Sequence, residues 1–141
     1  MTITQLSVFV ENKPGKLANI IKLLANANVD IRALSIADTS DFGILRIIVD
    51  DTEKALAAIK AGGLLVSKTD VLAAKVSDKP GGLSSLLTML HQKGVDIEYM
   101  YSFIAHDKGN AYMVLRVEDT ARVEAFLAEN GYETVAEKDF D

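Results

Sequence analysis

Apolar residues follow a helical spacing in two segments of the chain that resemble each other. From Pro14 the sequence reads PGKLANIIKLLANANVDI, and from Pro80 it reads PGGLSSLLTMLHQKGVDI. In both segments the apolar residues recur every three or four positions, which places them on one face of a helix. Pro, Gly, Leu and the Val-Asp-Ile ending recur 66 positions apart. Similarity at a fixed separation predicts an internal repeat.

The similarity continues beyond these segments, with a drift of two residues. IIVDDTEKALAAI, near Ile47, matches VLRVEDTARVEAFL, near Val114. The drift predicts loops of different length between the second and third strands of each repeat. Residues 39–41 and 106–110 carry the turn-forming side chains expected there.

Each repeat is predicted to run strand, helix, strand, strand, helix, strand. In the first repeat we expect strands over Ile3–Val10, Ile31–Ala37, Gly43–Val49 and Leu64–Lys68, and helices over Gly15–Asn28 and Thr52–Lys60. In the second we expect strands over Val71–Ser77, Ile97–Ile104, Ala111–Val117 and Glu133–Ala136, and helices over Gly82–Lys93 and Thr120–Asn130. Asp51 and Asp119 come just before two of these helices, where a carboxylate can accept from an unpaired N–H group.

This element order predicts an α+β fold of two ferredoxin-like βαββαβ repeats, over residues 1–70 and 71–141. Each antiparallel sheet would carry its helices on one face and leave the other face open. The connection from Lys68 to Val71 has no Gly or Pro and almost no length. We therefore expect the two sheets to join into one eight-stranded sheet.

Composition narrows the function. The 141 residues carry 15 basic and 20 acidic side chains, a net charge of −5, and no Cys. Because the basic residues are scattered among acidic ones, we expect no nucleic-acid partner. The chain shows no secretory signal pattern at its start and no apolar run long enough to span a membrane, so we expect a cytoplasmic protein without a membrane partner.

Catalytic chemistry is not predicted. The two His residues, His91 and His106, have no triad or metal-ligand set around them in the sequence. Without Cys, two distant His residues make a weak case for a metal site. We expect neither an enzyme nor a bound metal or cofactor.

The strongest candidates for chemistry are two Pro-Gly turns, ENKPGKL over Glu11–Leu17 and SDKPGGL over Ser77–Leu83. Each lies between a strand and a helix, where N–H groups of the first helical turn attract a carboxylate. Asn12 and Asp78, two residues before each Pro, offer partners for a bound amino acid. The alternative is that Asn12 and Asp78 only cap their helices and that the turns are structural.

Further candidates lie at the start of the second strand of each repeat, where Asp30 and Asp96 offer acceptors for an ammonium group. The predicted ligand-binding residues are Asn12, Lys13, Gly15, Lys16, Leu17, Asp30, Ile31, Asp78, Gly81, Gly82, Leu83, Asp96, Ile97 and Tyr99. Tyr99, Tyr101 and Phe103 alternate along one predicted strand, either to stack on a ligand or to be covered by a second copy in a homodimer.

The ENKPGKL and SDKPGGL turns, with NVDI and GVDI after their helices, resemble the ACT domain family of small-ligand sensors, twice over nearly the whole chain. In ACT-regulated phosphoglycerate dehydrogenases the turn resembles His-x-Asn-Arg-Pro-Gly, so Asn12 matches its Asn whereas Val10 replaces its His. Asp30 and Asp96 fall where those domains have a ligand-contacting Asn.

The resemblance to tandem ACT regions of aspartokinase type implies a regulatory sensor that binds a free amino acid where the repeats meet and acts on a separate metabolic enzyme. The alternative from another class is a ligand-free module that uses its open sheet faces for protein assembly.

Overall fold

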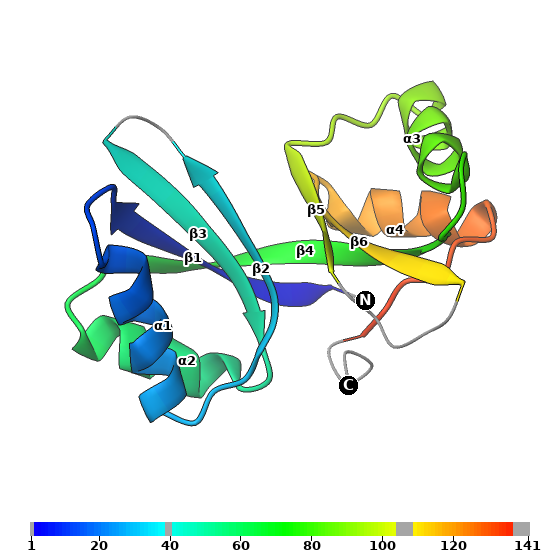
Figure 1. The fold of residues 1–141 in the computed structure, drawn as a ribbon. Helices are drawn as coiled ribbons and strands as arrows, with labels where there is room; N and C mark the ends of the chain where they lie inside the picture. Colours follow the sequence, from blue (N-terminus) through cyan, green and yellow to red (C-terminus); the bar gives the residue numbers. More distant parts are fainter. Residues whose placement is uncertain (1, 39–40, 104–108, 137–141) are drawn as a thin grey trace. The chain divides into compact units, whose positions relative to one another are not determined.

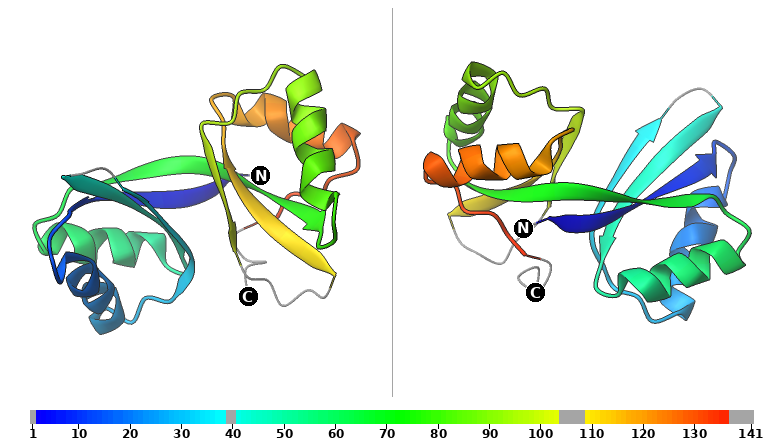
Figure 2. Two further views of the ribbon diagram at one scale, coloured as in Figure 1. Left: turned by 45° about the horizontal axis from the view of Figure 1, so that its top comes forward. Right: turned by 180° about the vertical axis from the view of Figure 1, so that it is seen from behind.

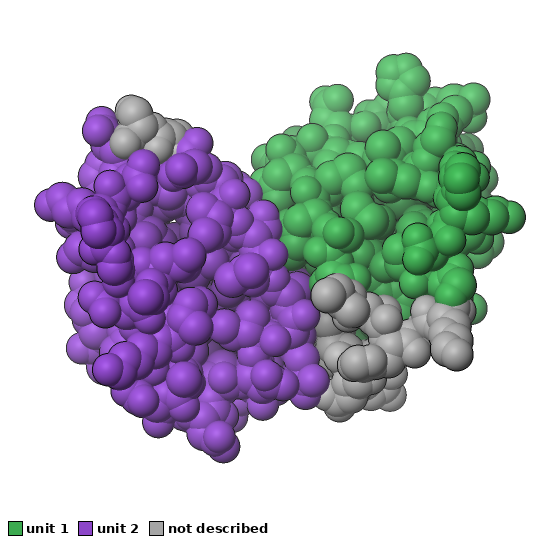
Figure 3. All heavy atoms as spheres, in the orientation of Figure 1, with its two compact units in different colours: residues 1–3, 70–141 green, residues 4–69 purple. Residues whose placement is uncertain are grey.

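The computed structural model describes residues 2–38, 41–103 and 109–136. It divides into two compact units, one of residues 4–69 and one of residues 1–3 with 70–141 (Figure 3). Each unit builds its own core, and the strands of the described residues belong to one six-stranded sheet. The predicted turns over residues 39–40 and 106–108 lie outside the described residues.

The unit of residues 4–69 has the strand order β2-β3-β1-β4. Its elements are β1 (Ile3–Glu11), α1 (Lys16–Asn26), β2 (Ile31–Asp38), β3 (Phe42–Val49), α2 (Thr52–Ala61) and the start of β4 (Val66–Ser77). β3 pairs antiparallel with both β1 and β2. Both helices lie on the same face of this sheet (Figures 1 and 2). Between sheet and helices lies a core that includes Leu6, Val8, Ile20, Leu24, Leu45, Ile47 and Ile59.

The second unit repeats this plan with the order β4-β6-β5. Its elements are the rest of β4, α3 (Gly82–Gln92), β5 (Tyr99–Phe103), β6 (Asn110–Arg116) and α4 (Thr120–Glu129). β6 pairs antiparallel with β4 and β5. Its core includes Leu72, Ala74, Leu86, Leu90, Leu115 and Leu127. The predicted α+β class of tandem ferredoxin-like repeats is confirmed.

The number of strands differs from the prediction. The strands expected over Leu64–Lys68 and Val71–Ser77 form one continuous strand, β4, of 12 residues. Its sequence contains no Gly or Pro that would end a strand. Its backbone forms hydrogen bonds with β1 on one side and β6 on the other. The strand expected over Glu133–Ala136 is reduced to a single bridge between Thr134 and Ala74. The described residues therefore form one sheet of six strands. The expected joining of the two sheets is confirmed, and the expected number of eight strands is wrong.

The predicted helix starts are confirmed at α2 and α4. The carboxylate of Asp51 accepts a hydrogen bond from the N–H of Lys54, and that of Asp119 accepts one from the N–H of Arg122, each at 3.1 Å. Both are N-cap contacts that satisfy a backbone donor left open by the helix. None of the helices in the described ranges combines the length and apolar character that a membrane crossing requires.

Candidate functional site

The two Pro-Gly turns adopt the same backbone conformation. Gly15 and Gly81 take the N-cap positions of α1 and α3 with φ of +82° and +90°. In each turn the first helical N–H is already used, because Lys16 donates to the carbonyl of Lys13 at 3.3 Å and Gly82 donates to that of Lys79 at 3.0 Å. Neither helix has a side-chain cap, so the interpretation of Asn12 and Asp78 as caps is wrong.

The glycines of the two turns have different roles. A Cβ built on Gly15 meets no atom within 4 Å, so no other part of the described chain approaches its backbone closely. Gly15 is required by its positive φ, which L residues adopt only with strain. At Gly82 a Cβ would lie 2.0 Å from the carbonyl oxygen of Ser77. Close approach of two backbone segments is thus found in the second turn at Gly82.

Asn12 and Asp78 hold equivalent places beside the third strand of their repeats. The N–H of Asn12 donates to the carbonyl of Asp41 at 3.0 Å, and that of Asp78 donates to the carbonyl of Gly109 at 2.9 Å. These bonds tie each turn to the beginning of β3 or β6. The start of each turn, before its Pro, is therefore held by a backbone hydrogen bond to the segment that leads into β3 or β6.

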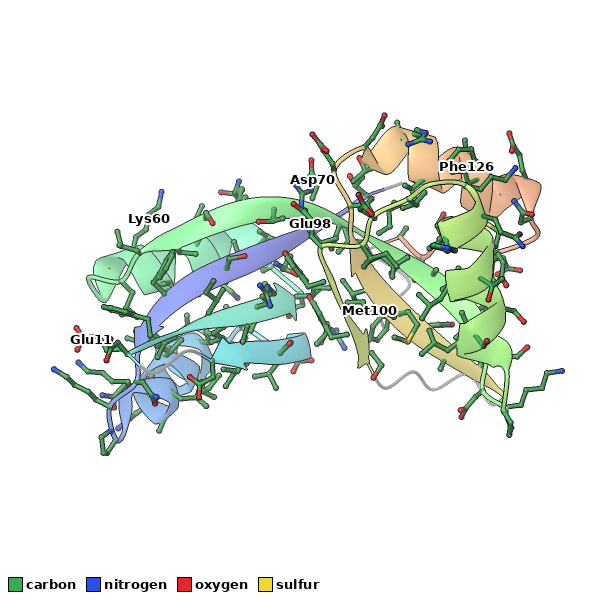
Figure 4. The ribbon with its side chains drawn as sticks, turned by 90° about the horizontal axis from the view of Figure 1, so that it is seen from above. Glu11, Lys60, Asp70, Glu98, Met100 and Phe126 are labelled. Carbon is green, nitrogen blue, oxygen red and sulfur yellow. The ribbon has the colours of Figure 1, made fainter. Side chains whose placement is uncertain are left out.

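Glu11 and Lys13 set the charge of the first turn, and Figure 4 labels Glu11 where β1 ends. The ammonium of Lys13 lies 3.1 Å from the Glu11 carboxylate. The hydrogen bond from Lys13, then the positive charges of Lys13 and Lys16, lower the pKa of Glu11 below its ordinary value. Glu11 thus stays ionised at lower pH than an isolated glutamate.

A pocket of about 150 Å³ opens beside the first turn, which we call the turn pocket. Its walls come from the end of β1, the first turn of α1, the end of β2 and the beginning of β3. It is lined by Val10, Glu11, Asn12, Lys13, Leu17, Ile36, Asp38 and Gly43. Three predicted site residues, Asn12, Lys13 and Leu17, therefore share one pocket.

Besides Glu11, the pocket is lined by a second acidic residue, Asp38, which the sequence did not single out. Asp38 pairs with Gly43 in the sheet, and its Oδ1 lies 3.4 Å from the place where a Cβ on Gly43 would be. Because β1 and β2 both pair antiparallel with β3, they run in the same direction, and their ends lie at the same edge. The parallel direction of β1 and β2, which the predicted strand-helix-strand order already implies, is the signal that could have identified Asp38.

Asp30 and Ile31 lie at the opposite end of this sheet. Ile31 pairs with Val49 and Glu11 pairs with Phe42, so seven residues of β3 separate them, or roughly 23 Å at the rise of a strand. The backbone carbonyl of Asp30 accepts from the N–H of Asp50 at 3.0 Å, and its carboxylate lies 3.3 Å from the guanidinium of Arg32. Asp30 and Ile31 therefore do not line the turn pocket of their own repeat.

The second repeat shows the same separation. Tyr99 pairs with Arg116, whereas Ser77, just before the second turn, pairs with Asn110 at the other end of β6. Asp96 lines a different pocket, next to Asp119 and Arg122 at the start of α4. Within their own unit, Asp96, Ile97 and Tyr99 are not brought together with the turn residues Asp78, Gly81, Gly82 and Leu83.

Tyr99, Tyr101 and Phe103 do lie on one face of β5, as their alternation predicts. They are half-buried, and the ring of Phe103 contacts that of Tyr112 with 5.1 Å between centroids. The large apolar side chains that are exposed lie elsewhere, mostly in the first repeat.

Each repeat has another pocket, on the side of its first helix that faces the segment after its second helix. In the first repeat this apolar pocket, of about 340 Å³, is lined by Phe9, Val10, Glu11, Lys16, Asn19, Ile20, Leu23, Phe42, Gly62, Gly63, Leu64 and Leu65. In the second repeat the corresponding polar pocket is lined by Ser77, Lys79, Pro80, Gly81, Gly82, Ser85 and Tyr132. The predicted site residues Lys16, Gly81 and Gly82 belong to these pockets. Among the described residues there is no group of three or more His, Cys, Asp or Glu that could hold a metal ion.

Comparison with known proteins supports the repeat architecture. The family model described as "ACT domain pair" matches residues 1–141. Protein BT0572 from Bacteroides thetaiotaomicron is 39% identical, with a TM-score of 0.92 over 99% of this chain and 96% of that one. No curated protein sequence matches the chain.

More distant solved structures share the fold. The regulatory subunit of aspartate kinase from Thermus thermophilus, in ligand-free form, is 13% identical, with a TM-score of 0.66 over 91% of this chain and 90% of that one. The corresponding subunit from Thermus flavus is 16% identical, with a TM-score of 0.65 over 89% and 88% of the two chains.

Proposed function

The chain belongs to the ACT domain pair family, and from that premise we propose that it is an amino-acid sensor that binds its ligand in the turn pocket and regulates a separate metabolic enzyme. ACT domains are regulatory modules, and two of the structural relatives are regulatory subunits of aspartate kinase. The likeness to those subunits is one of fold, so the ligand has to be argued from the pocket itself.

The observation that carries the proposal is the meeting of an amide, the Lys13–Glu11 ion pair and a second carboxylate around one small pocket. Asn12 supplies both a donor and an acceptor, Lys13 a cation, and Asp38 an anion. A zwitterion needs partners of both charges at once. The volume of about 150 Å³ is smaller than pockets for drug-sized ligands, and it suits an amino acid with a short side chain.

The ligand's two charged groups then have defined partners. We place its α-ammonium against the carboxylate of Asp38 and its α-carboxylate toward Lys13 and the N-terminal end of α1. The helix macrodipole and the lysine charge both favour an anion there. The side chain would contact Leu17 and Ile36, which therefore set the preference among amino acids. The binding of the ligand between the repeats stays a prediction of the sequence.

A thermal-shift screen of the twenty amino acids tests this function, because a ligand that binds only the folded chain raises its unfolding midpoint. Calorimetry should then show that Asn12→Ala weakens binding of the selected amino acid by about 1.5–3 kcal/mol, the contribution of a hydrogen bond to a charged group. Asp38→Asn should weaken it similarly.

Asn26→Ala, at the end of α1 and outside the pocket, is the matched control and should bind as the parent protein does. Asp78→Ala reports on the second turn. If no amino acid shifts the midpoint, the assembly module is favoured instead. If Asn12→Ala, Asp38→Asn and Asp78→Ala all bind as tightly as the parent, the turns are structural and the placement is wrong.

We further propose that the chain forms a homodimer in the cytoplasm. β2 is the outer strand of its sheet, and Leu34 and Ile36 on it are 48% and 46% exposed. An edge strand with exposed apolar side chains is a ready surface for pairing with a second copy.

A further inference from the structure

We propose that the apolar pocket of the first repeat is a second binding site, separate from the turn pocket, for a small apolar molecule that carries a carboxylate. The pocket lies between α1 and the segment of residues 62–65, whereas the turn pocket lies toward β2. Its volume of about 340 Å³ falls within the range of sites for small organic ligands.

The walls and the exposed rim of this pocket are formed mainly by large apolar side chains, which is unusual for a surface that faces solvent. Ile20, Leu23 and Leu64 line it, and at its rim Phe9, Phe42 and Leu65 are 53%, 52% and 74% exposed. A cluster of large exposed apolar side chains around a concavity marks a place where another apolar group binds.

The backbone holds this cluster in place. The N–H of Phe9 donates to the carbonyl of Leu65 at 3.0 Å, which joins the two halves of the rim. At Gly62 a Cβ would lie 2.6 Å from Cδ1 of Leu23, so the glycine leaves the Leu23 side chain in its present position on the wall, and a larger residue would shift it. The pocket is thus preformed by hydrogen bonding and packing within the first repeat.

The polar groups of the pocket select the charge of the ligand. Lys16 contributes a cation at the N-terminal end of α1, where the helix macrodipole also favours an anion. Among the described residues Lys16 forms no ion pair within 4 Å. The nearby carboxylate of Glu11 is paired with Lys13 at 3.1 Å, which reduces its repulsion of an incoming carboxylate. Asn19 adds an amide as a further hydrogen-bonding group.

The second repeat provides an internal comparison. At the equivalent positions of the polar pocket, Gly82 stands in place of Lys16, Ser85 in place of Asn19, and Tyr132 in place of Leu64. The helix cation and the aliphatic wall are therefore lost together. We assign the apolar carboxylate site to the first repeat.

Calorimetric titration with 3-phenylpropanoate and 4-methylpentanoate tests the proposal. Both acids should bind, and neutral 3-phenylpropanamide should bind about tenfold more weakly, because it lacks the charge that Lys16 recognises. Phenylalanine and leucine, which add an α-ammonium to the same skeletons, distinguish two natural sources: equal binding identifies an apolar amino acid, and binding of the acids alone identifies a carboxylic acid without an amino group.

Three variants place the site. Lys16→Gln should weaken binding of 3-phenylpropanoate about tenfold, and Asn19→Trp should abolish it by filling the pocket. Leu65→Glu puts a repelling charge on an exposed rim position without touching the core, so it serves if Asn19→Trp fails to fold. The matched controls are Lys22→Gln on the same helix and Ser85→Trp in the polar pocket, and both should bind as the parent does.

The site is overturned if neither acid binds, if the amide binds as tightly as the acid, or if Leu65→Glu and Asn19→Trp both leave binding unchanged. Failure of the turn pocket gives a different result. In that case no amino acid binds in a way that responds to Asn12→Ala or Asp38→Asn, while 3-phenylpropanoate still binds and still responds to Leu65→Glu.

Discussion

At the scale of single residues, the charge of the first Pro-Gly turn depends on Glu11 and its two lysine neighbours. Lys13 pairs directly with Glu11, and Lys16 acts on it from a greater distance. Glu11 itself lines both the apolar pocket and the turn pocket, so the same carboxylate borders both proposed sites. Its ionisation therefore bears on ligand binding at either one.

Lys13→Gln should raise the pKa of Glu11 toward that of an isolated glutamate, since it removes the hydrogen bond and the nearest positive charge. An NMR titration of the Glu11 side-chain carboxyl carbon measures this. Lys22→Gln is the control and should leave the titration unchanged. An unchanged Glu11 titration in Lys13→Gln would show that the ion pair is absent in solution.

The sign of the linked stability follows from the lowered pKa. A carboxylate whose folded pKa is depressed stabilises the fold above its unfolded pKa, and this contribution disappears as the pH falls through the folded pKa. The difference in stability between Lys13→Gln and the parent should therefore shrink in acid.

At the scale of elements, the two Pro-Gly turns share a conformation while depending on their glycines for different reasons. Gly15 and Gly81 both begin a helix from the left-handed region. Gly82, one residue further, lies against the backbone of Ser77, whereas Lys16 at the equivalent position carries a full side chain. The second turn is therefore packed more tightly against its strand than the first.

Gly82→Ala should destabilise the chain more than Gly15→Ala does. Alanine at Gly15 meets open space and incurs only the strain of a positive φ, about 1–2 kcal/mol. Alanine at Gly82 meets a backbone oxygen and forces the turn itself to move. Urea unfolding midpoints of the two variants, compared with the parent, measure the difference. Equal midpoints would contradict the tighter packing of the second turn.

At the scale of the whole molecule, the strand β4 runs without interruption from one compact unit into the other. Each unit has its own core, and β4 contributes to both sheets. The outer strand β2 is left with two exposed apolar side chains, Leu34 and Ile36. The exposed apolar surface expected at Tyr99, Tyr101 and Phe103 is thus found mainly in the first repeat.

Sedimentation at micromolar concentration should give twice the mass of one chain. Leu34→Lys should convert the dimer to a monomer, because a charge on an edge strand opposes pairing with a second copy. Leu65→Glu, at an exposed apolar position away from β2, is the control and should remain dimeric. A monomeric parent protein, with and without ligand, would contradict the dimer.

The sequence by itself determined the repeat, the order of helices and strands as far as α4, and the starts of α2 and α4. These depend on local chemistry: helical spacing of apolar residues, Asp51 and Asp119 as caps, and Pro-Gly turns that require a positive φ. The order strand-helix-strand also implies that β1 and β2 run in the same direction. The end of β2, with Asp38, therefore lies beside the first turn, and the start of β2, with Asp30, lies at the other end of the sheet.

Only the tertiary structure decided which residues share a pocket and where strands end. The fusion of two expected strands into β4 depends on partners that come from both units, and pattern and propensity within the segment do not specify them. The apolar pocket joins residues 9–23, 42 and 62–65, which are distant in sequence. The walls of this pocket are held by the hydrogen bond from Phe9 to Leu65 and by the space beside Gly62. The cavity remains because side chains of separate elements do not fill the volume between them.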